Sequence, residues 1–249
     1  YHFLRDHCFS DHLPRTVIFA GKAAPGYRMA KLIIQLIHSV AAVINRDPLT
    51  REALQIVFIP DYNVSMAERI IPAADLSEHI STAGTEASGT SNMKFCLNGS
   101  LIMGTLDGST IEIKERVGDE NIFIFGHSID QLRALAKDGY EPTAWSKKHS
   151  ELEFVLNTIE RGFYSKADRN LFRPIWESMM VYGDRYFHLA DFPSYIEAQS
   201  QAEKAFQQPE NWRKKVLSNI AQIGWFSSDR TVLEYNRDIW HLPTLLMDK

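Results

Sequence analysis

The stretch Gly84-Thr85-Glu86-Ala87-Ser88-Gly89-Thr90-Ser91-Asn92-Met93-Lys94 is rich in glycine and small polar residues, and the rest of the chain is organised around it. It runs into Phe95-Cys96-Leu97-Asn98-Gly99, whose Asn-Gly pair is typical of a helix end. Gly84 and Gly89 allow sharp turns and a close approach of the backbone to another molecule. We expect a helix to begin near Thr90, where its unpaired N–H groups and positive dipole end favour an anion, phosphate above all.

Lys94 falls in the first turn or so of that expected helix. The helix dipole disfavours a lysine there unless an anion lies nearby or the amine is consumed in a bond. Lysine is also the side chain that forms Schiff bases with carbonyl cofactors such as pyridoxal phosphate. The pattern predicts a phosphate-bearing ligand with a lysine beside it, although the spacing alone also fits an ordinary Gly/Ser loop with a solvated lysine.

The segment from Glu86 to Lys94 closely resembles the cofactor signature of the α-glucan phosphorylases, the family of glycogen, starch and maltodextrin phosphorylases. Five further blocks resemble that family in the same order, namely Gly21–Tyr27, Ile71–Thr82, Gly104–Gly108, Glu120–Gly126 and Phe226–Arg230. Six blocks in family order are a specific resemblance, and it extends over nearly the whole chain.

The resemblance implies an enzyme, a glycosyltransferase in which inorganic phosphate attacks the terminal α-1,4 glucosyl bond of a glucan. Glucose 1-phosphate is released with retention of configuration. The implied fold is the glycosyltransferase B type, in which two Rossmann-like domains face each other across a cleft. This chain resembles most of the second domain, which binds pyridoxal 5'-phosphate. In that family the cofactor's phosphate, rather than its ring, acts as the acid–base group.

The resemblance also assigns the cofactor site residue by residue. Lys94 would carry pyridoxal phosphate as a Schiff base, the Thr90 and Ser91 region would hold its phosphate, and Tyr62 would lie against its ring. Many members have glycine where this chain has Ser91, but donation by the backbone N–H survives that change. Many members also have, at the position of Asn63, an arginine that pairs with a phosphate, and asparagine cannot supply that charge.

The glucosyl side of the site is assigned in the same way. The residues implied to bind substrate are Glu86, Ala87, Ser88 and Gly89, with Tyr27 at the entrance to the site. Glu86 is the one carboxylate within the glycine-rich loop, and a carboxylate that accepts sugar O–H groups makes charge-assisted contacts. Without the resemblance, Glu86 would equally fit an exposed loop glutamate.

The first half of the chain has an α/β pattern. Thr16–Gly21 and Leu54–Pro60 are short, nearly all-apolar runs, typical of parallel strands buried on both faces. Each is followed by a loop and a helical segment, at about Gly26–Asn45 and Val64–Ile71. This order predicts a Rossmann-like, doubly wound parallel sheet, whose ligands bind at the loops after the strands' carboxyl ends. Those loops are Gly21–Tyr27 and Asp61–Asn63, and the Glu86–Lys94 turn is expected to converge on the same edge.

The segment after the signature is expected to form a hairpin. Ser100–Thr105 and Thr110–Glu115 are apolar-rich, and Asp107-Gly108 between them is a strong turn signal. On this interpretation the Gly104–Gly108 block is hairpin punctuation and not a phosphate loop, because no helix follows it.

The strand pattern disappears from Glu141 onward. We therefore expect residues 1–140 to form the Rossmann-like part and residues 141–249 a C-terminal, mainly helical extension. Pro193 and Pro209 are expected at helix starts, and a last helix is expected from the Ser227–Asp229 cap to Trp240.

The composition excludes several classes of function. A net charge of −4 without a long basic run does not favour nucleic-acid binding, and no apolar run approaches the roughly 18 residues of a membrane span. Cys8 and Cys96 give no disulfide framework, so a reducing, cytoplasmic location is expected. His2, His7 and His12 have no accompanying Cys or carboxylate pattern, so no metal site is expected. The start of the chain lacks the form of a signal peptide and reads like the middle of a longer protein.

Two alternatives remain open at this stage. One is a nucleotide-sugar glycosyltransferase of the same architecture, which needs no lysine Schiff base. The other is a non-catalytic glucan-binding relic of such an enzyme. The full-length protein is expected to be an allosteric homodimer in glycogen degradation, and the 249-residue chain alone is expected to be inactive. The sequence does not distinguish glycogen, starch and maltodextrin as the preferred glucan.

Overall fold

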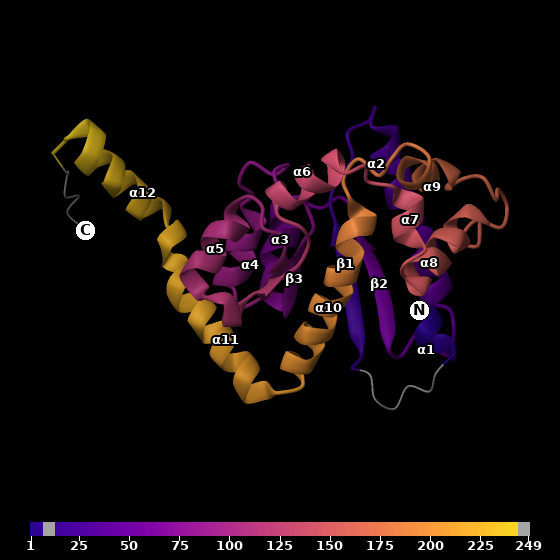
Figure 1. Cartoon of the computed structure of the whole chain (residues 1–249). Helices are drawn as coiled ribbons and strands as arrows, with labels where there is room; N and C mark the ends of the chain where they lie inside the picture. The colour runs from indigo at the N-terminus through magenta and orange to yellow at the C-terminus, as the bar shows by residue number, and fades with distance from the viewer. Residues whose placement is uncertain (7–12, 244–249) are drawn as a thin grey trace. The chain divides into compact units, whose positions relative to one another are not determined.

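The computed structural model describes residues 1–6 and 13–243, so His7, Cys8 and His12 lie outside the described residues. The chain divides into two compact units that interleave in the sequence (Figure 1). The first unit comprises Tyr1–Arg69 and Gly126–Glu197, and the second comprises Ile70–Phe125 and Ala198–Lys249. This is a different division from an α/β part ending at residue 140, and the expected domain boundary stays a prediction.

The first unit contains a two-stranded parallel sheet. Strand β1 (Arg15–Ala20) pairs with β2 (Leu54–Ile59) in register from Arg15 opposite Leu54 to Ala20 opposite Ile59. Helix α2 (Arg28–Ile44) connects the strands, with Asn45 as its C-cap, and lies within two residues of the expected helix at both ends. The other helices of the first unit are α1 (His2–Asp6), α3 (Val64–Ile70), α6 (Ile129–Lys137), α7 (Pro142–Ser146), α8 (Ser150–Glu160), α9 (Arg173–Met180) and the first part of α10 (His188–Phe206).

The strands of this sheet are not buried on both faces, contrary to the expectation from their apolar sequences. Their side chains alternate between partly buried and exposed over the first four residues of each strand, and Ile18 on β1 is 45% exposed. An alternating pattern is typical of a sheet that is covered on one face. A run of apolar residues predicted the strands correctly, but it did not determine how many faces are covered.

The second unit contains a three-stranded parallel sheet in the order β3-β4-β5. Its strands are β3 (Leu76–His79), β4 (Leu101–Gly104) and the short β5 (Phe123–Ile124). In the central strand, β4, every residue is buried. Strand β3 was not predicted, because Leu76-Ser-Glu-His79 is short and contains a single apolar residue. All strand pairs of both sheets are parallel, as the doubly wound α/β pattern requires.

The core of the second unit lies where two helices meet strand β4. Helices α4 (Ser91–Leu97) and α5 (Ser109–Val117) contribute buried apolar side chains to one cluster with β4. Its buried members are Cys96, Ile102, Ile113, Val117, Ile122 and Ile223. The cluster holds the start of α4 and the start of α5 on one scaffold, and these two helix starts carry the site described below.

The expected hairpin at Asp107-Gly108 is wrong. Leu101–Gly104 is strand β4, but Ser109–Val117 is helix α5, so the connection is a strand–loop–helix. Gly108 stands at the N-cap position with a φ of 49° and a ψ of −141°, a conformation reserved essentially for glycine. The Asp-Gly pair was read correctly as a sharp turn. The error lay in the segment after it, where Ile111, Ile113 and Val117 have spacings that a helix accommodates as well as a strand.

The remaining elements of the second unit are helical, as expected for those after residue 141. They are η2 (Ile71–Ala73), η3 (Asp119–Asn121), α11 (Pro209–Gln222), η4 (Ile223–Phe226), α12 (Ser228–Tyr235) and the π-helical η5 (Asn236–Trp240). Pro209 begins α11 and Ser227 precedes α12, as predicted. Pro193 does not begin a helix but lies inside α10, in its second turn, where a proline forgoes few helical hydrogen bonds.

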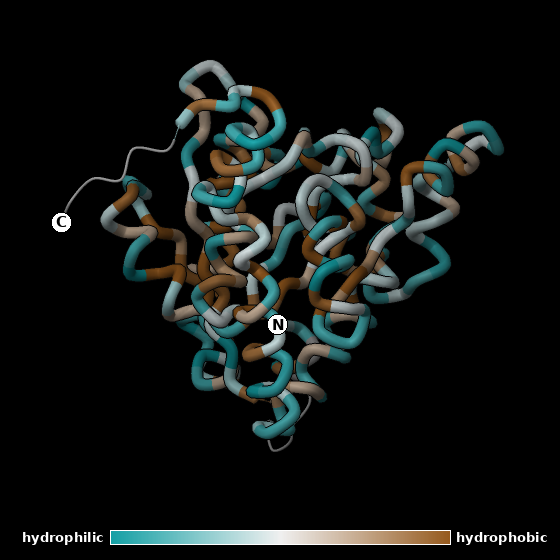
Figure 2. Tube along the Cα trace, turned by 90° about the vertical axis from the view of Figure 1, so that its left-hand side faces the viewer, coloured by the Kyte–Doolittle hydropathy of each residue, from teal (hydrophilic) through white to brown (hydrophobic). Residues whose placement is uncertain are grey.

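The described helices have no membrane-spanning character. In the part of the chain with described coordinates, none combines the length and the apolar character that a crossing needs. Figure 2 shows hydrophilic residues interspersed with hydrophobic ones along the trace.

Candidate functional site

The signature segment forms a loop followed by helix α4, as the sequence predicted. Helix α4 begins at Ser91 with Thr90 as its N-cap and ends before Asn98. Gly84 and Gly89 have φ values of 88° and 77°, so both glycines supply the left-handed turns for which they were singled out. The Lys94 N–H donates to the Thr90 carbonyl at 3.3 Å, which places Lys94 one turn into the helix.

The residues of this segment that were predicted to bind the cofactor are accessible. The side chains of Thr90, Ser91 and Lys94 are exposed, and the Thr90 hydroxyl makes no capping bond to the helix. The first N–H groups of α4 therefore have no side-chain partner from Thr90. The Met93 N–H donates to Asn92 Oδ1 at 2.9 Å, so the donors left to a ligand at this helix start are those before Met93. Together with a hydroxyl and an amine one turn away, they are a donor set suited to a phosphate with an adjacent carbonyl group.

A single buried carboxylate holds the first part of the loop. Asp107 is 5% exposed, and its Oδ1 accepts the Gly84 N–H at 2.8 Å while its Oδ2 accepts the Glu86 N–H at 2.9 Å. Between these two residues, the Thr85 N–H and hydroxyl donate to the Thr82 carbonyl at 3.0 and 2.7 Å. The backbone on both sides of Thr85 is therefore tied down.

The second part of the loop is held by the start of helix α5. The Ser109 N–H donates to the Ser88 carbonyl at 2.6 Å, and the Ser109 hydroxyl donates to the Gly89 carbonyl at 3.0 Å. The buried side chain of Asn92 lies 2.9 Å from the Ser109 hydroxyl and donates to Thr110 Oγ1 at 3.2 Å. The 107–110 segment is therefore bonded to both halves of the signature loop.

The absence of a side chain at Gly108 leaves room for the Glu86 side chain. A Cβ on Gly108 would overlap the Ser88 carbonyl oxygen and would lie 3.0 Å from Glu86 Cγ. A Cβ on Gly89 would lie 3.8 Å from Glu86 Oε1. The Glu86 side chain therefore runs over Gly108 toward Gly89, and its carboxylate remains exposed.

These elements surround a hollow of about 230 Å³ at the carboxyl edge of the β3-β4-β5 sheet. Four of the residues predicted to contact ligand line it: Glu86, Ser88, Gly89 and Ser91. The others that line it are Glu78, His79, Ile80, Ser81, Asn92, Asp107 and Thr110. Ala87, Thr90 and Lys94 belong to the same loop and helix without lining this hollow. The position agrees with the rule that ligands bind beyond the carboxyl ends of parallel strands.

His79 lies at the end of β3, on the wall of this hollow. Burial lowers the pKa of its imidazole from 6.5 to about 4, because a charged ring is poorly solvated there. Its Nε2 lies 2.9 Å from the Ser77 hydroxyl, and its ring meets Phe95 edge-on. His79 is therefore neutral at physiological pH and can act toward a ligand as a neutral donor or acceptor.

Three predicted site residues belong to the first unit, and one of them has a clear local role. Tyr27 is the N-cap residue of α2 and is 57% exposed, and Tyr62 is partly buried. Asn63 accepts the Met66 N–H at 3.1 Å and donates to the Asp61 carbonyl at 2.9 Å. Asn63 therefore caps the start of α3, a position at which asparagine is strongly favoured.

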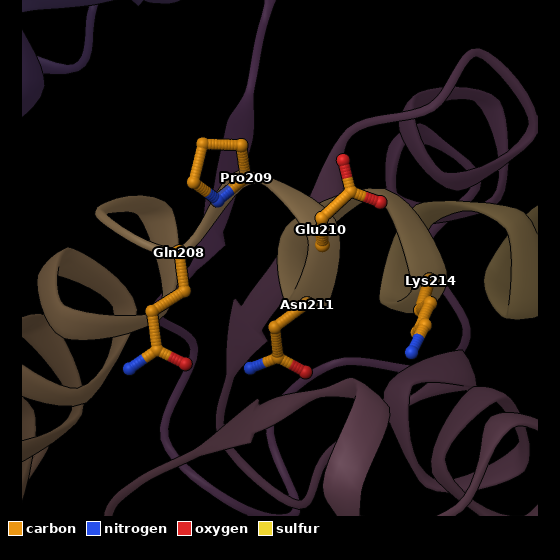
Figure 3. A pocket seen from close by; sticks show the side chains of 5 residues that line it. All are labelled: Gln208, Pro209, Glu210, Asn211 and Lys214. Atoms are coloured by element: carbon orange, nitrogen blue, oxygen red, sulfur yellow. The ribbon is translucent and has the colours of Figure 1, made fainter.

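A metal centre and a second hollow were also considered. Among the described residues, no group of three His, Cys, Asp or Glu side chains is placed to hold a metal ion. A shallow hollow of about 420 Å³ lies where α11 begins and is lined by Gln208, Pro209, Glu210, Asn211 and Lys214 (Figure 3). Its side chains come from consecutive turns of one exposed segment, and it shares no residue with the signature loop.

The supporting residues of the site were missed by reasoning from the sequence. Asp107, Ser109 and Thr110 were assigned to a hairpin, and Asn92 was given no role. A signal was present, because Asp-Gly followed by Ser-Thr also matches the start of a helix. The Gly104–Gly108 block had been recognised as part of a resemblance but not as a partner of the loop 20 residues earlier.

The sequence was compared with those of known protein families and curated proteins. The sequence profile of carbohydrate phosphorylases matches residues 1–242. The chain is 50% identical over 244 residues to the glycogen phosphorylase of Chlamydia pneumoniae, 48% identical over 238 residues to that of Synechocystis, and 50% identical over 230 residues to the liver form of human glycogen phosphorylase. These alignments cover 98, 96 and 92% of this chain.

The same alignments cover 30, 28 and 27% of the three relatives. The chain thus spans less than a third of the length of the curated relatives it matches.

Proposed function

The chain belongs to the carbohydrate phosphorylase family, and from this premise we propose that it forms the cofactor-binding part of an α-1,4-glucan phosphorylase. The full-length enzyme transfers the terminal glucosyl unit of a glucan to inorganic phosphate and releases glucose 1-phosphate with retention. The observation that carries the proposal is the exposed loop from Glu86 to Lys94, which is held by Asp107 and Ser109 at the carboxyl edge of a parallel sheet.

The glucosyl unit is bound by the first part of this loop. The Glu86 carboxylate accepts sugar hydroxyl groups, and Ala87, Ser88 and Gly89 lie against the sugar through backbone and small side chains. Support comes from the hollow at the sheet edge, which Glu86, Ser88 and Gly89 line. Charge-assisted bonds from a carboxylate suit a ligand rich in O–H donors. Tyr27 stands at the entrance in the full-length enzyme.

Pyridoxal phosphate is held by the second part. Lys94 supplies the amine for covalent attachment, the N–H groups at the start of α4 with Thr90 and Ser91 hold the phosphate, and Tyr62 lies against the ring. The uncommitted Thr90 hydroxyl and the exposed Lys94 amine fit this assignment. When bound, the cofactor supplies a phosphate whose second pKa lies near neutrality, suited to acid–base work. Asn63 has a neutral side chain, so it offers that phosphate no charge. Its amide group caps α3 instead.

The proposal extends to partners and surroundings. The full-length protein is an allosterically regulated homodimer that acts in the cytoplasm on α-1,4-glucans. Cysteine chemistry fits a reducing compartment: Cys96 is buried and forms no disulfide among the described residues, and burial raises the pKa of its thiol to about 12. Such a thiol is inert and contributes packing instead.

The decisive experiment locates the cofactor in the full-length protein. Borohydride reduction followed by peptide mapping should place a pyridoxyl group on Lys94. Lys94→Ala should carry no covalent cofactor and should lose phosphorolysis by at least the roughly 10²–10⁴-fold of an acid–base group. Lys114→Ala is the matched control, because the Lys114 amine is already paired with Asp119 at 2.6 Å.

Two results would contradict the proposal. A pyridoxyl group on Lys22 or Lys114 would move the cofactor site elsewhere. The absence of any reducible Schiff base, with transfer from a nucleotide sugar, would favour a glycosyltransferase of the same architecture, and the absence of both activities would favour a non-catalytic glucan-binding protein.

The 249-residue chain alone is proposed to be inactive. Its glucosyl contacts come from one loop, and orientation of the reactants across a closed cleft contributes a large part of an enzyme's rate. The purified chain is assayed with pyridoxal phosphate, phosphate and maltodextrin. Formation of glucose 1-phosphate at roughly 1 s⁻¹ or faster, a rate typical of enzymes, would show that the chain contains the whole active site.

A further inference from the structure

Asp107 binds the loop that carries Glu86 in an uncommon way. Each carboxylate oxygen of Asp107 accepts one backbone N–H, from Gly84 at 2.8 Å and from Glu86 at 2.9 Å. Because the two donors flank Thr85, one side chain sets the direction of the backbone on both sides of that residue. Asp107 itself is 5% exposed, which shields these charge-assisted bonds from competition by water.

Aspartate is the residue type that this arrangement requires. A carboxylate has two acceptor oxygens, and both are used here. Asparagine at the same place would keep one acceptor and would turn an NH₂ group toward the second backbone N–H. An N–H that faces an NH₂ group loses its charge-assisted hydrogen bond and meets a second donor instead, so the loop would move to find the N–H another partner. We therefore expect Asp107→Asn to change the backbone conformation at Gly84 or at Glu86.

The Glu86 side chain depends on that backbone. It runs over Gly108, the residue next to Asp107, and a Cβ on Gly108 would already approach Glu86 Cγ to 3.0 Å. Beyond Glu86 the loop is pinned again by Ser109, which binds the Ser88 and Gly89 carbonyls. Ser109 holds the backbone after Glu86. The position of the Glu86 carboxylate therefore depends on the backbone before it, which Asp107 holds.

We propose that Asp107 is the positioning residue of this site: it sets the Glu86 carboxylate in the sheet-edge hollow by holding the N–H groups of Gly84 and Glu86. Asp107 acts through Glu86 and does not itself contact the reacting atoms. The nature of the ligand that Glu86 receives, a glucosyl unit, rests on the proposed function. The positioning itself rests on the contacts around Asp107.

The test is a double-mutant cycle in the full-length holoenzyme. Asp107→Asn is made in the wild type and in Glu86→Gln, and kcat/KM for glucan phosphorolysis is measured with the bound cofactor quantified. Glu86→Gln removes a charged hydrogen bond and should lower kcat/KM about 10–100-fold. Asp107→Asn should lower kcat/KM about tenfold or more in the wild type, and less than about threefold in the Glu86→Gln background, because residues that act as a unit are not additive.

The control is another buried aspartate. Asp184, in the first unit, is 2% exposed and accepts the Tyr140 hydroxyl at 2.7 Å and the Leu189 N–H at 2.8 Å. Asp184→Asn removes a buried charge far along the sequence from the loop, and kcat/KM should stay within about twofold of the wild type. Equal losses from Asp107→Asn in both backgrounds would overturn the proposal and make Asp107 merely structural.

A second measurement does not depend on activity. Amide hydrogen exchange of the peptide covering residues 83–90 should become about tenfold faster or more in Asp107→Asn and stay unchanged in Asp184→Asn. Unchanged exchange in Asp107→Asn would overturn the positioning role. Faster exchange in a protein whose wild type shows no phosphorolysis would uphold the positioning of the loop and refute the proposed function, so the two failures are distinguishable.

Discussion

Strand β1 of the first sheet and strand β4 of the second are both mostly apolar, but their side chains differ greatly in burial. Strand β1, Arg15-Thr-Val-Ile-Phe-Ala20, has four apolar residues in six, yet Ile18 is 45% exposed. Strand β4, Leu101-Ile-Met-Gly104, has side chains that are fully buried at Leu101, Ile102 and Met103. Apolar composition therefore predicted these two strands and did not predict which of them lies in a core.

Neighbouring elements account for the difference. Strand β4 is hydrogen-bonded on both sides, to β3 and to β5, and packs against α4 and α5. In the described residues, β1 and β2 pair with each other and with no other strand. The functional loop follows the same division, since the signature segment is held by the loop that leaves β4. A rigid, buried strand is a suitable base for groups that must be placed accurately.

The largest effect that tests this comparison is on stability. Ile102→Ala in β4 removes buried methyl groups and leaves a cavity, so it should lower the free energy of unfolding by about 2–5 kcal/mol. Ile18→Ala on the exposed face of β1 should cost about 1 kcal/mol or less. Denaturant midpoints of the two variants, measured side by side in the full-length protein, give the contrast. Equal losses would mean that Ile18 is as buried in the full-length protein as Ile102.

A smaller effect comes from the glycines in the loops that follow β4 and β1. Gly108→Ala places a residue at a φ of 49° and drives its Cβ into the Ser88 carbonyl, so it should cost about 1–3 kcal/mol of backbone strain. It should also weaken glucan binding, since the Glu86 side chain runs over Gly108. Gly21→Ala is the matched control for stability, because a Cβ there meets no atom within 4 Å. Thermal denaturation compares the two variants, and glucan KM is measured for Gly108→Ala against the wild type. A tolerated Gly108→Ala would contradict the packing described for the loop.

The smallest effect concerns His79 at the end of β3. Its pKa is lowered from 6.5 to about 4 in the folded protein. Between these two pH values the imidazole is therefore protonated in the unfolded chain and neutral in the folded one. The stability due to neutral His79 is complete above pH 6.5 and declines as the pH falls toward 4, by about 1.4 kcal/mol per pH unit. The unfolding free energies of wild type and His79→Gln, compared between pH 7 and pH 5, measure this. Parallel curves would mean that His79 titrates in the folded protein as it does in the unfolded chain.

Local patterns predicted much of the fold. The glycines at 84 and 89, the helix start after Thr90 and the helix end at Asn98-Gly99 are local, because each depends on backbone conformations or caps within a few residues. Helix α2 was predicted to within two residues at each end. The parallel α/β class also followed from the alternation of apolar runs and helical segments.

Other features depend on contacts between distant segments, and the sequence alone did not reveal them. Strand β3 exists because β4 offers it hydrogen bonds across 25 positions of sequence, and Leu76-Ser-Glu-His79 has little preference of its own. Ser109–Val117 is a helix because its buried Ile113 and Val117 meet Cys96 and Ile102 in one cluster.

The site divides along the same line. The sequence by itself predicted which residues of the loop would face a ligand, because Lys94, Glu86 and the glycines are close together in the chain and form one short pattern. Only the tertiary structure decided what holds them, since the bonds from Asp107 to Gly84 and Glu86 join residues 23 and 21 positions apart. A carboxylate that binds two backbone N–H groups leaves no trace in the sequence of those partners, because every residue except proline carries the same N–H.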